Sequence, residues 1–212
     1  MKKTLALCMF CFVCANTPSM AQEEQNNTSQ LTPADVPAPN PQITDTVDFT
    51  ELRNTFAKRA DFEMRCVLNS PKVEWGKAME AGQFQKAYEL ASAWLNQCPV
   101  DASAHMWAYG ALKQLGDVAK ADEHKRWYWG IIDSILKTGD GKSPRTAYVT
   151  ISIAEEYKVL QYKGLKPVEQ SVVNGPPTVD KLIAVPMNNN GDKTTIYFNP
   201  YWHFVRLSNM VK

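Results

Sequence analysis

The sequence predicts an α+β protein, in which helical hairpins come first and a small, mostly antiparallel sheet with one short helix follows. Residues 47–139 carry apolar side chains at helical spacing, and a pattern within them returns after 34 positions. Residues 140–212 instead hold short runs of alternating apolar and polar residues, separated by Gly, Pro and Asn. We therefore expect a helical, repeat-like region over 47–139 and an α+β region over 140–212 that packs on the helices.

The first 21 residues have the three parts of a secretory signal peptide. Lys2 and Lys3 form the basic start, an apolar run extends over 5–15, and Ser19 and Ala21 are small residues before a cleavage site. A retained membrane anchor is the alternative, although the apolar run is short for a membrane span. The sequence predicts an exported protein, periplasmic or secreted, with no integral membrane segment after the signal peptide is removed.

The next segment, residues 22–46, is predicted to be a disordered linker. It holds four prolines and many Gln, Asn, Thr and Ser residues, with almost no large apolar side chain. Such a composition cannot bury enough apolar surface to offset the entropy lost on ordering.

The charge of the chain argues against nucleic acid as a partner. Removing Lys2 and Lys3 with the signal peptide leaves 21 of the 23 basic residues, against 22 acidic ones. A net charge of about −1 gives no basic excess for nucleic acid or for a membrane surface.

Folding is expected to begin at a helix start near Asp48. Asp48 and Glu51 have the spacing of a capping box, and Phe49, Leu52 and Phe56 then fall on one face of the helix.

Three pairs of residues are 34 positions apart: Gly82 and Gly116, Phe84 and Val118, and Ala87 and Ala121. A glycine permits a tight turn between antiparallel helices, and an alanine lets two helices approach closely. Pro99 closes the first pair of helices because it lacks a backbone donor. This pattern resembles about two tetratricopeptide repeats. It departs from that family at Tyr109 and Lys125, and a plain pair of helical hairpins with the same period is the alternative.

The region after residue 140 contains four candidate strands. Apolar and polar residues alternate over 147–151, and further strand-like runs cover 168–173, 181–185 and 194–198. The last two are separated by a turn-rich stretch, which predicts a hairpin with a loop longer than two residues. Pro186 is expected near a strand end.

The short helix of this region is predicted to start at Ser152. Ser152 and Glu155 have capping-box spacing, and Gly164 ends the helix. Glu155 would then accept backbone N–H groups, and Glu156 would complement the helix dipole. Because neighbours on a helix point in different directions, these two glutamates are not expected to act as an acid–base pair.

Two cysteines, Cys66 and Cys98, remain outside the predicted signal peptide. In an oxidising compartment such a pair predicts one disulfide, which would contribute roughly 3–4 kcal/mol on the chain-entropy model. Two buried free thiols are the alternative, because the bond also requires suitable geometry.

The run Gly-Asp-Gly-Lys-Ser at 139–143 invites comparison with a phosphate-binding loop. Such a loop needs a preceding strand, a following helix and an earlier glycine, and Leu136 occupies that glycine's position. We predict instead that Gly139 caps the preceding helix in the left-handed conformation and that the run forms a turn. If the turn is also a site, Lys142, Ser143 and Arg145 are the candidates for an anion or peptide contact.

The aromatic run at 127–129 is the second candidate contact surface. Trp127, Tyr128 and Trp129 cannot all point into the core from one helix, so at least one ring should reach solvent or another element. Exposed rings here would suit a partner or a glycan. No cofactor and no metal site is predicted: Asp101 and His105 have i,i+4 spacing, but no further ligand is evident nearby.

Several stretches together resemble an exported bacterial family known only as a domain of unknown function. They are the run from Ser134 through 139–143, the residues 146–149, the sequence Glu155-Glu156-Tyr157, and Tyr197-Phe198. The resemblance implies export and a mixed helical and stranded fold. It implies no activity, substrate or catalytic residue.

Two hypotheses for function follow. The first is a non-catalytic interaction module of the cell envelope, in which the helices offer a groove to a protein or peptide. The second is a cell-envelope enzyme or glycan-binding protein that uses the aromatics near Trp127 and Trp129 and the turn at 139–146. An enzyme requires ionisable groups that converge in one pocket. The sequence shows no such set and favours the module.

Overall fold

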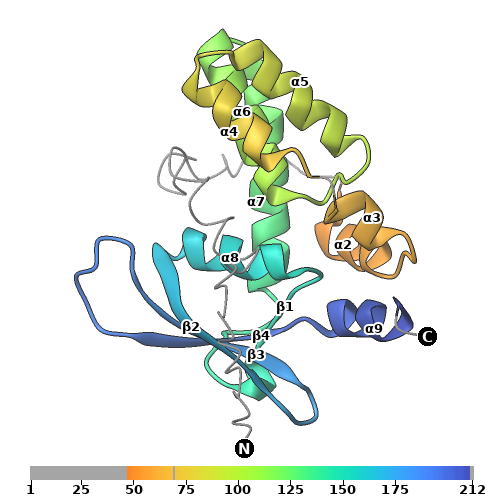
Figure 1. Ribbon diagram of the computed structural model, residues 1–212, viewed down its shortest axis with the longest axis vertical. Coiled ribbons are helices and arrows are strands. Elements are labelled where there is room, and N and C mark those ends of the chain that lie inside the picture. The colour runs from red at the N-terminus through yellow and green to blue at the C-terminus, as the bar shows by residue number, and fades with distance from the viewer. Residues whose placement is uncertain (1–46, 69, 211–212) are drawn as a thin grey trace, which may run out of the picture.

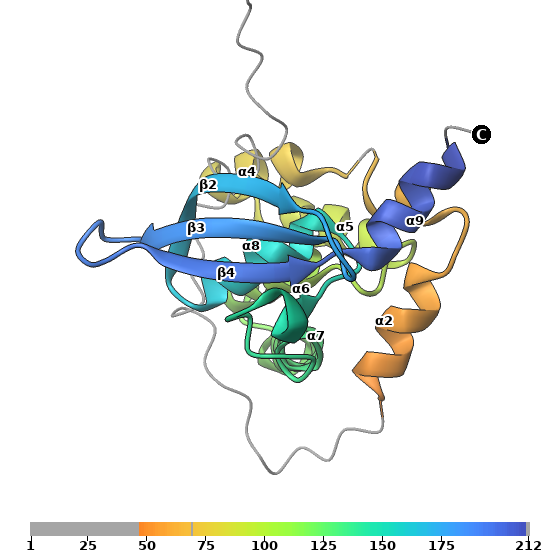
Figure 2. The same cartoon turned by 90° about the horizontal axis from the view of Figure 1, so that it is seen from below.

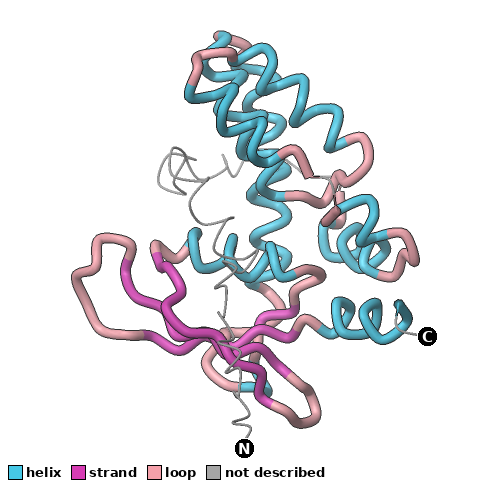
Figure 3. Tube along the Cα trace, viewed as in Figure 1, coloured by secondary structure: helices cyan, strands magenta, loops and turns pink. Residues whose placement is uncertain are grey.

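Eight α-helices and one four-stranded sheet make up the part of the protein that the computed structural model describes, residues 47–68 and 70–210. The predicted signal peptide (1–21) and linker (22–46) lie outside the described residues. Most of the helices lie on one side of the sheet, and the last helix lies beside it (Figures 1 and 3). The predicted α+β class is confirmed. Within the described residues, no helix is both long enough and apolar enough to cross a membrane.

Two short helices come first. Helix α2 (Phe49–Ala57) begins at Asp48, whose carboxylate accepts the backbone N–H of Glu51 at 2.9 Å. The predicted N-terminal cap is therefore confirmed. Helix α3 (Phe62–Cys66) follows directly, and the two lie beside the main group of helices (Figure 1).

Four helices follow, each packed on the next: α4 (Lys72–Glu80), α5 (Phe84–Leu95), α6 (Ala102–Leu115) and α7 (Val118–Leu136). Gly82 and Gly116 occupy the α4–α5 and α6–α7 turns, with φ of 67° and 78°. Residues other than glycine are strained at such backbone angles, which explains the glycine at each turn. Ala87 and Ala121 are buried, as close helix packing requires.

Helix α6 is the central helix of the protein. Every residue from Ala102 to Leu112 is buried. A helix at a protein surface normally has one buried face and one exposed face. Helices α5 and α7 cover it on two sides, and the helix α8 described below also contacts it. An α6 enclosed in this way contributes to the core and leaves little surface for a ligand.

Helix α7 carries a glycine where α2 packs on it. A Cβ atom at Gly130 would lie 2.1 Å from the ring of Phe49. We expect Gly130→Ala to lower the free energy of unfolding by about 1–3 kcal/mol, because overpacking outweighs the better helix propensity of alanine. Urea denaturation measures the change. In a Phe49→Ala background the same substitution should be neutral or stabilising, and an equal loss in both backgrounds would contradict this packing role.

The remaining elements are a 3₁₀ turn (Pro144–Thr146), β1 (Tyr148–Val149), α8 (Ile153–Tyr162), β2 (Leu165–Val173), β3 (Val179–Pro186), β4 (Thr194–Asn199) and α9 (Tyr201–Met210). The strand order is β1-β4-β3-β2. β2 and β4 run antiparallel to β3, whereas β1 runs parallel to β4. The predicted strands, the mostly antiparallel sheet and the position of Pro186 at a strand end are confirmed.

One face of the sheet packs on helices, whereas none of the described helices covers the other face. Leu182, Ala184, Ile196 and Phe198 share a buried cluster with residues of α6, α7 and α8. The alternate residues of β3 and β4 face outward, and Figure 2 shows the sheet from this uncovered side. The sheet thus shares a buried cluster with α6, α7 and α8, and a second buried cluster lies among α2 to α6.

Three local predictions differ from the structure. Gly139 is not left-handed; Gly141 is, with φ of 68°. Glycine is needed at 139 for a different reason, since a Cβ atom there would lie 2.3 Å from the carbonyl oxygen of Thr146. The first strand has two residues rather than five, and α9 was not predicted. The sequence of α9 begins with aromatic and β-branched residues, which have modest helix propensity.

Candidate functional site

The most polar part of the interior lies where α2, α8 and the sheet meet. Arg53 of α2 donates from Nε and Nη2 to the two carboxylate oxygens of Glu155, at 2.9 and 2.6 Å. Its guanidinium also donates to the hydroxyl of Ser134 and to the carbonyl of Val149. Both charged side chains are almost fully buried. The pair therefore fixes α2 to the start of α8.

Glu155 only partly fulfils the capping role predicted for it. Its carboxylate accepts the N–H of Ile151 at 2.8 Å, which is a backbone donor just before α8. The hydroxyl of Ser152, however, makes no capping hydrogen bond. The reciprocal capping box is therefore wrong, because the buried Arg53 holds the Glu155 carboxylate in place.

Glu156 faces a different neighbour, Asp180 of β3. Glu156 is 0 % exposed and Asp180 is 3 % exposed. Burial, and then the charge of Asp180, raise the pKa of Glu156 well above its usual value; burial also raises the pKa of Asp180. Thr150 donates to Oε1 of Glu156 at 3.5 Å, and Oε2 of Glu156 has no hydrogen-bond partner among the described residues. Burial beside a second carboxyl therefore favours the protonated, neutral form of Glu156. Glu156 was expected to complement the helix dipole with its negative charge, and the raised pKa of the buried group contradicts that expectation.

The Glu156–Asp180 pair was missed because the two residues come from separate elements. One signal was available in the sequence. Asp180 lies two and four residues before Leu182 and Ala184, so its side chain points to the same, core-facing side of β3. A carboxylate on the core face of a strand needs a partner.

The pair predicts an unusual dependence of stability on pH. The raised pKa means that the folded protein keeps the Glu156 proton after the unfolded chain has lost it. Stability should therefore fall as pH rises from about 4.5 through the folded pKa. We expect Glu156→Gln to remove this loss of stability. The variant should therefore become increasingly more stable than the wild type between pH 4 and pH 8.

Thermal unfolding across that pH range measures the effect. Glu80→Gln is the control, because Glu80 is exposed on α4 and its loss should leave the pH profile unchanged. Parallel profiles for the wild type and Glu156→Gln would contradict the raised pKa of Glu156.

A second buried arginine docks α9. Arg206 donates to the Glu63 carboxylate at 2.8 Å and to the carbonyls of Ala57 and Ile151. Its guanidinium also lies 4.0 Å from the centre of the Phe62 ring. One side chain thus joins α9 to α2, α3 and the segment before α8, and sequence reasoning gave no indication of it.

The predicted aromatic residues are half-buried rather than freely exposed. Trp127 stacks on His105 and meets the ring of Phe49 edge to face. Trp129 meets Tyr128 and Tyr162 edge to face. Tyr128 itself is fully buried. Elements α2, α6 and α8 therefore cover part of each tryptophan, and each keeps some surface open to solvent.

The turn at 139–146 is organised around Asp140. Its carboxylate accepts the N–H of Lys142 and the hydroxyl of Thr146, and Ser143 caps the 3₁₀ turn by accepting the N–H of Thr146. Ser143 therefore has a structural role in the turn. Lys142 and Arg145 are exposed and can contact a ligand, but they converge on no other described side chain.

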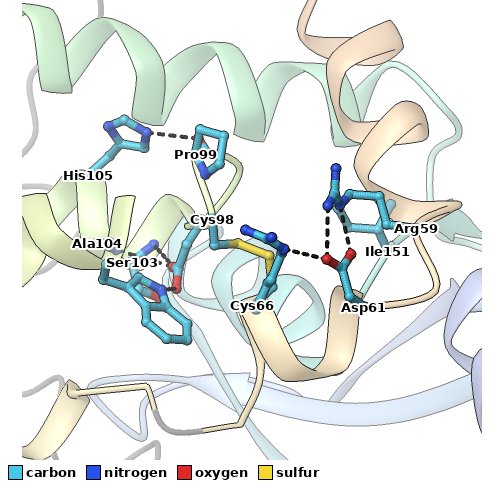
Figure 4. The surroundings of a disulfide bond; sticks show 12 residues. Arg59, Asp61, Cys66, Cys98, Pro99, Ser103, Ala104, His105 and Ile151 are labelled. Carbon is cyan, nitrogen blue, oxygen red and sulfur yellow. Dashed lines mark hydrogen bonds and ion pairs between the residues drawn. A yellow bond between two sulfur atoms is a disulfide. The ribbon is translucent and has the colours of Figure 1, made fainter. Parts of the chain in front are cut away.

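The predicted disulfide joins Cys66 of α3 to Cys98, with Cα atoms 5.2 Å apart (Figure 4). Beside it is a small cleft lined by Phe62, Ser103, Glu155 and Lys158 among others. The space open to water in this cleft is about 20 Å³, enough for one water molecule. It cannot hold a substrate.

His105 and His124 form a pair on neighbouring helices. Their Nδ1 atoms are 3.0 Å apart, and Nε2 of His105 lies 3.0 Å from the carbonyl oxygen of Pro99. Burial lowers the pKa of His105 to about 3. Asp101, expected on the same face as His105, instead caps α6 and accepts the indole N–H of Trp94. Among the described residues, no group of three or more His, Cys, Asp and Glu side chains is arranged around a metal position.

Comparison with known proteins gives one positive finding. No curated protein and no solved structure matches the chain. A family model described as "Domain of unknown function (DUF4919)" matches residues 63–201, which is most of the described fold from α3 to the first residue of α9. The chain therefore belongs to the DUF4919 family of domains of unknown function.

Proposed function

We propose that the protein is a non-catalytic interaction module of the cell envelope, and that it binds an extended segment of a protein partner along strand β2. The observation that carries the proposal is the open edge of the sheet. β2 is the outermost strand, and Figure 2 shows it at the margin of the sheet. The predicted signal peptide and the disulfide support a location outside the cytoplasm.

The second half of β2 is suited to accept another strand. An irregularity in pairing between Pro167 and Glu169 interrupts the first half, a feature that protects sheet edges from pairing. Residues 169–173 pair regularly with β3 and are free of proline. Val172 on this stretch is 54 % exposed. Unpaired backbone groups supply affinity for an extended peptide, and exposed side chains supply selectivity.

The helices are less suitable as a peptide groove. A groove requires exposed side chains on its lining helices, and α6 exposes none between Ala102 and Leu112. The open surface of Trp127 and Trp129 is reduced by Phe49, His105 and Tyr162. Lys142 and Arg145 remain candidates for a separate contact, since the Gly141 carbonyl of their turn accepts the N–H of Tyr197 of β4, and β3 lies between β4 and β2.

We infer a non-catalytic role because a substrate has no access to the buried carboxyl pair. The carboxyl pair with the most perturbed protonation, Glu156 and Asp180, is closed to solvent. A general acid must lie within hydrogen-bond reach of its substrate, which this pair does not offer in the present conformation. The alternative of an envelope enzyme or glycan-binding protein gains no specific support from these residues.

Site-directed photocrosslinking tests the proposal. A photoreactive phenylalanine at position 171, an exposed position of β2, should give one adduct of defined mass in producing cells. Val172→Lys should abolish the adduct, because a charged side chain discourages pairing at an edge. The crosslinked residue of the partner should lie in a segment that can adopt an extended conformation.

Val118 provides the matched control. It is a valine of similar exposure, 65 %, at the start of α7. A probe at position 118 should give no such adduct, and Val118→Lys should leave the adduct from 171 unchanged. An adduct that survives Val172→Lys, or appears equally from position 118, would exclude β2 as the interface.

A further inference from the structure

The histidine pair has a feature that simple packing does not require. His105 belongs to α6 and His124 to α7, and their Nδ1 atoms face each other at 3.0 Å. His105 also contacts the carbonyl oxygen of Pro99 through Nε2, as Figure 4 shows. One imidazole is therefore held at both of its nitrogens.

These contacts determine which ring nitrogen of His105 carries a hydrogen. A carbonyl oxygen only accepts, so Nε2 of His105 carries the hydrogen in the contact with Pro99. Nδ1 of neutral His105 then presents a lone pair, and it points at Nδ1 of His124. Metal-binding histidines are oriented in this way, with the far N–H donated to a backbone carbonyl and the near lone pair turned to the ion.

We propose that His105 and His124 form a two-imidazole site for a divalent late first-row transition metal ion, which binds both Nδ1 atoms while the hydrogen on Nδ1 of His124 moves to its Nε2, so that both ligands are neutral imidazoles. At a metal–nitrogen distance of roughly 2.1 Å, the 3.0 Å separation gives an N–metal–N angle of roughly 90°. Two neighbouring ligands of a square-planar or octahedral ion subtend this angle. Imidazole suits copper, nickel and zinc, and affinity should be highest for Cu²⁺.

The surroundings favour an ion at this place. Trp127 stacks on His105 with ring centres 5.1 Å apart, and Tyr88 meets the edge of His124. These contacts limit rotation of both imidazole rings, so the rings lose little conformational entropy when a metal ion binds. The carboxylate of Glu123 acts electrostatically on His124, and its negative charge favours a cation.

The site opens to solvent on the side of His124. His105 is 4 % exposed, whereas His124 is half-buried. Water can therefore fill the positions that two imidazoles leave vacant, since no third His, Cys, Asp or Glu ligand is arranged there among the described residues. Such a site binds an exchangeable ion rather than a structural one. It is independent of the partner site proposed on β2.

Fluorescence gives a direct test because Trp127 lies against His105. Cu²⁺ added to the full chain should quench tryptophan emission and raise the unfolding temperature by mass action. Every protein compared carries Cys8→Ser, Cys11→Ser and Cys14→Ser, so that free thiols cannot bind the ion. His124→Gln should abolish both effects, and Trp127→Phe should remove most of the quenching but keep the rise in unfolding temperature.

His203→Gln is the matched control, since His203 is the third histidine of the chain and lies on α9. It should leave Cu²⁺ binding unchanged. Electron paramagnetic resonance of the bound Cu²⁺ should show coupling to two imidazole nitrogens, a readout that does not depend on any variant folding. Absence of binding to the wild type, or binding that His124→Gln retains, would overturn the proposal.

Discussion

Replacing Arg53 with methionine is expected to lower the free energy of unfolding by about 3–5 kcal/mol. Methionine preserves much of the side-chain volume but leaves the buried Glu155 carboxylate without its cation. The hydroxyl of Ser134 and the carbonyl of Val149 lose a donor as well. Urea denaturation, followed by circular dichroism, measures the loss from the change in midpoint at constant slope.

The chain provides a matched control in Arg59. Arg59 also makes a bidentate ion pair, with Asp61, but both side chains are 42 % exposed. Arg59→Met should cost much less than Arg53→Met, because solvent screens the pair. The double variant Arg53→Met with Glu155→Gln should recover part of the stability that Arg53→Met alone loses. Similar losses at Arg53 and Arg59 would show that burial does not set the strength of these pairs.

Removal of the disulfide is expected to cost about 3–4 kcal/mol. Cys66 and Cys98 are 32 residues apart, and on the chain-entropy model a loop of this length restricts the unfolded chain by about that amount. The bond joins α3 to the segment between α5 and α6, so its loss should also loosen α3. The double variant Cys66→Ser with Cys98→Ser, unfolded in urea, gives the free-energy change.

A reducing agent supplies the control for the disulfide. It should lower the unfolding midpoint of the wild type to nearly that of the double variant. The double variant itself should not respond. A wild-type midpoint that reduction leaves unchanged would show that the bond does not constrain the unfolded chain.

Local patterns were sufficient to predict most of the fold. The alternation over 181–185 and 194–198 identified β3 and β4, because each strand has one covered and one open face. The two glycines 34 residues apart located the helix turns, since both turns need a left-handed residue. Helix α9 escaped prediction because Arg206 stabilises it through contacts with residues distant in sequence.

The polar interior could not be predicted in the same way. Arg53 and Glu155 are 102 positions apart, and no periodicity in either segment relates them. Sequence reasoning placed glutamates 155 and 156 at the same helix start, yet one binds a buried cation and the other is buried beside a second carboxyl. Their surroundings come from α2 and β3, which become neighbours of α8 only in the folded chain.

The two buried arginines have a consequence for comparing relatives. Arg53 and Arg206 both lie outside residues 63–201, the segment matched by the family model, whereas Glu63 and Glu155 lie inside it. The homologous segment therefore contains two buried anions whose counter-ions come from flanking sequence. In an alignment of full-length relatives, positions 53 and 155 should vary together, as should positions 63 and 206. A relative without the flanking helices should carry uncharged residues at 63 and 155.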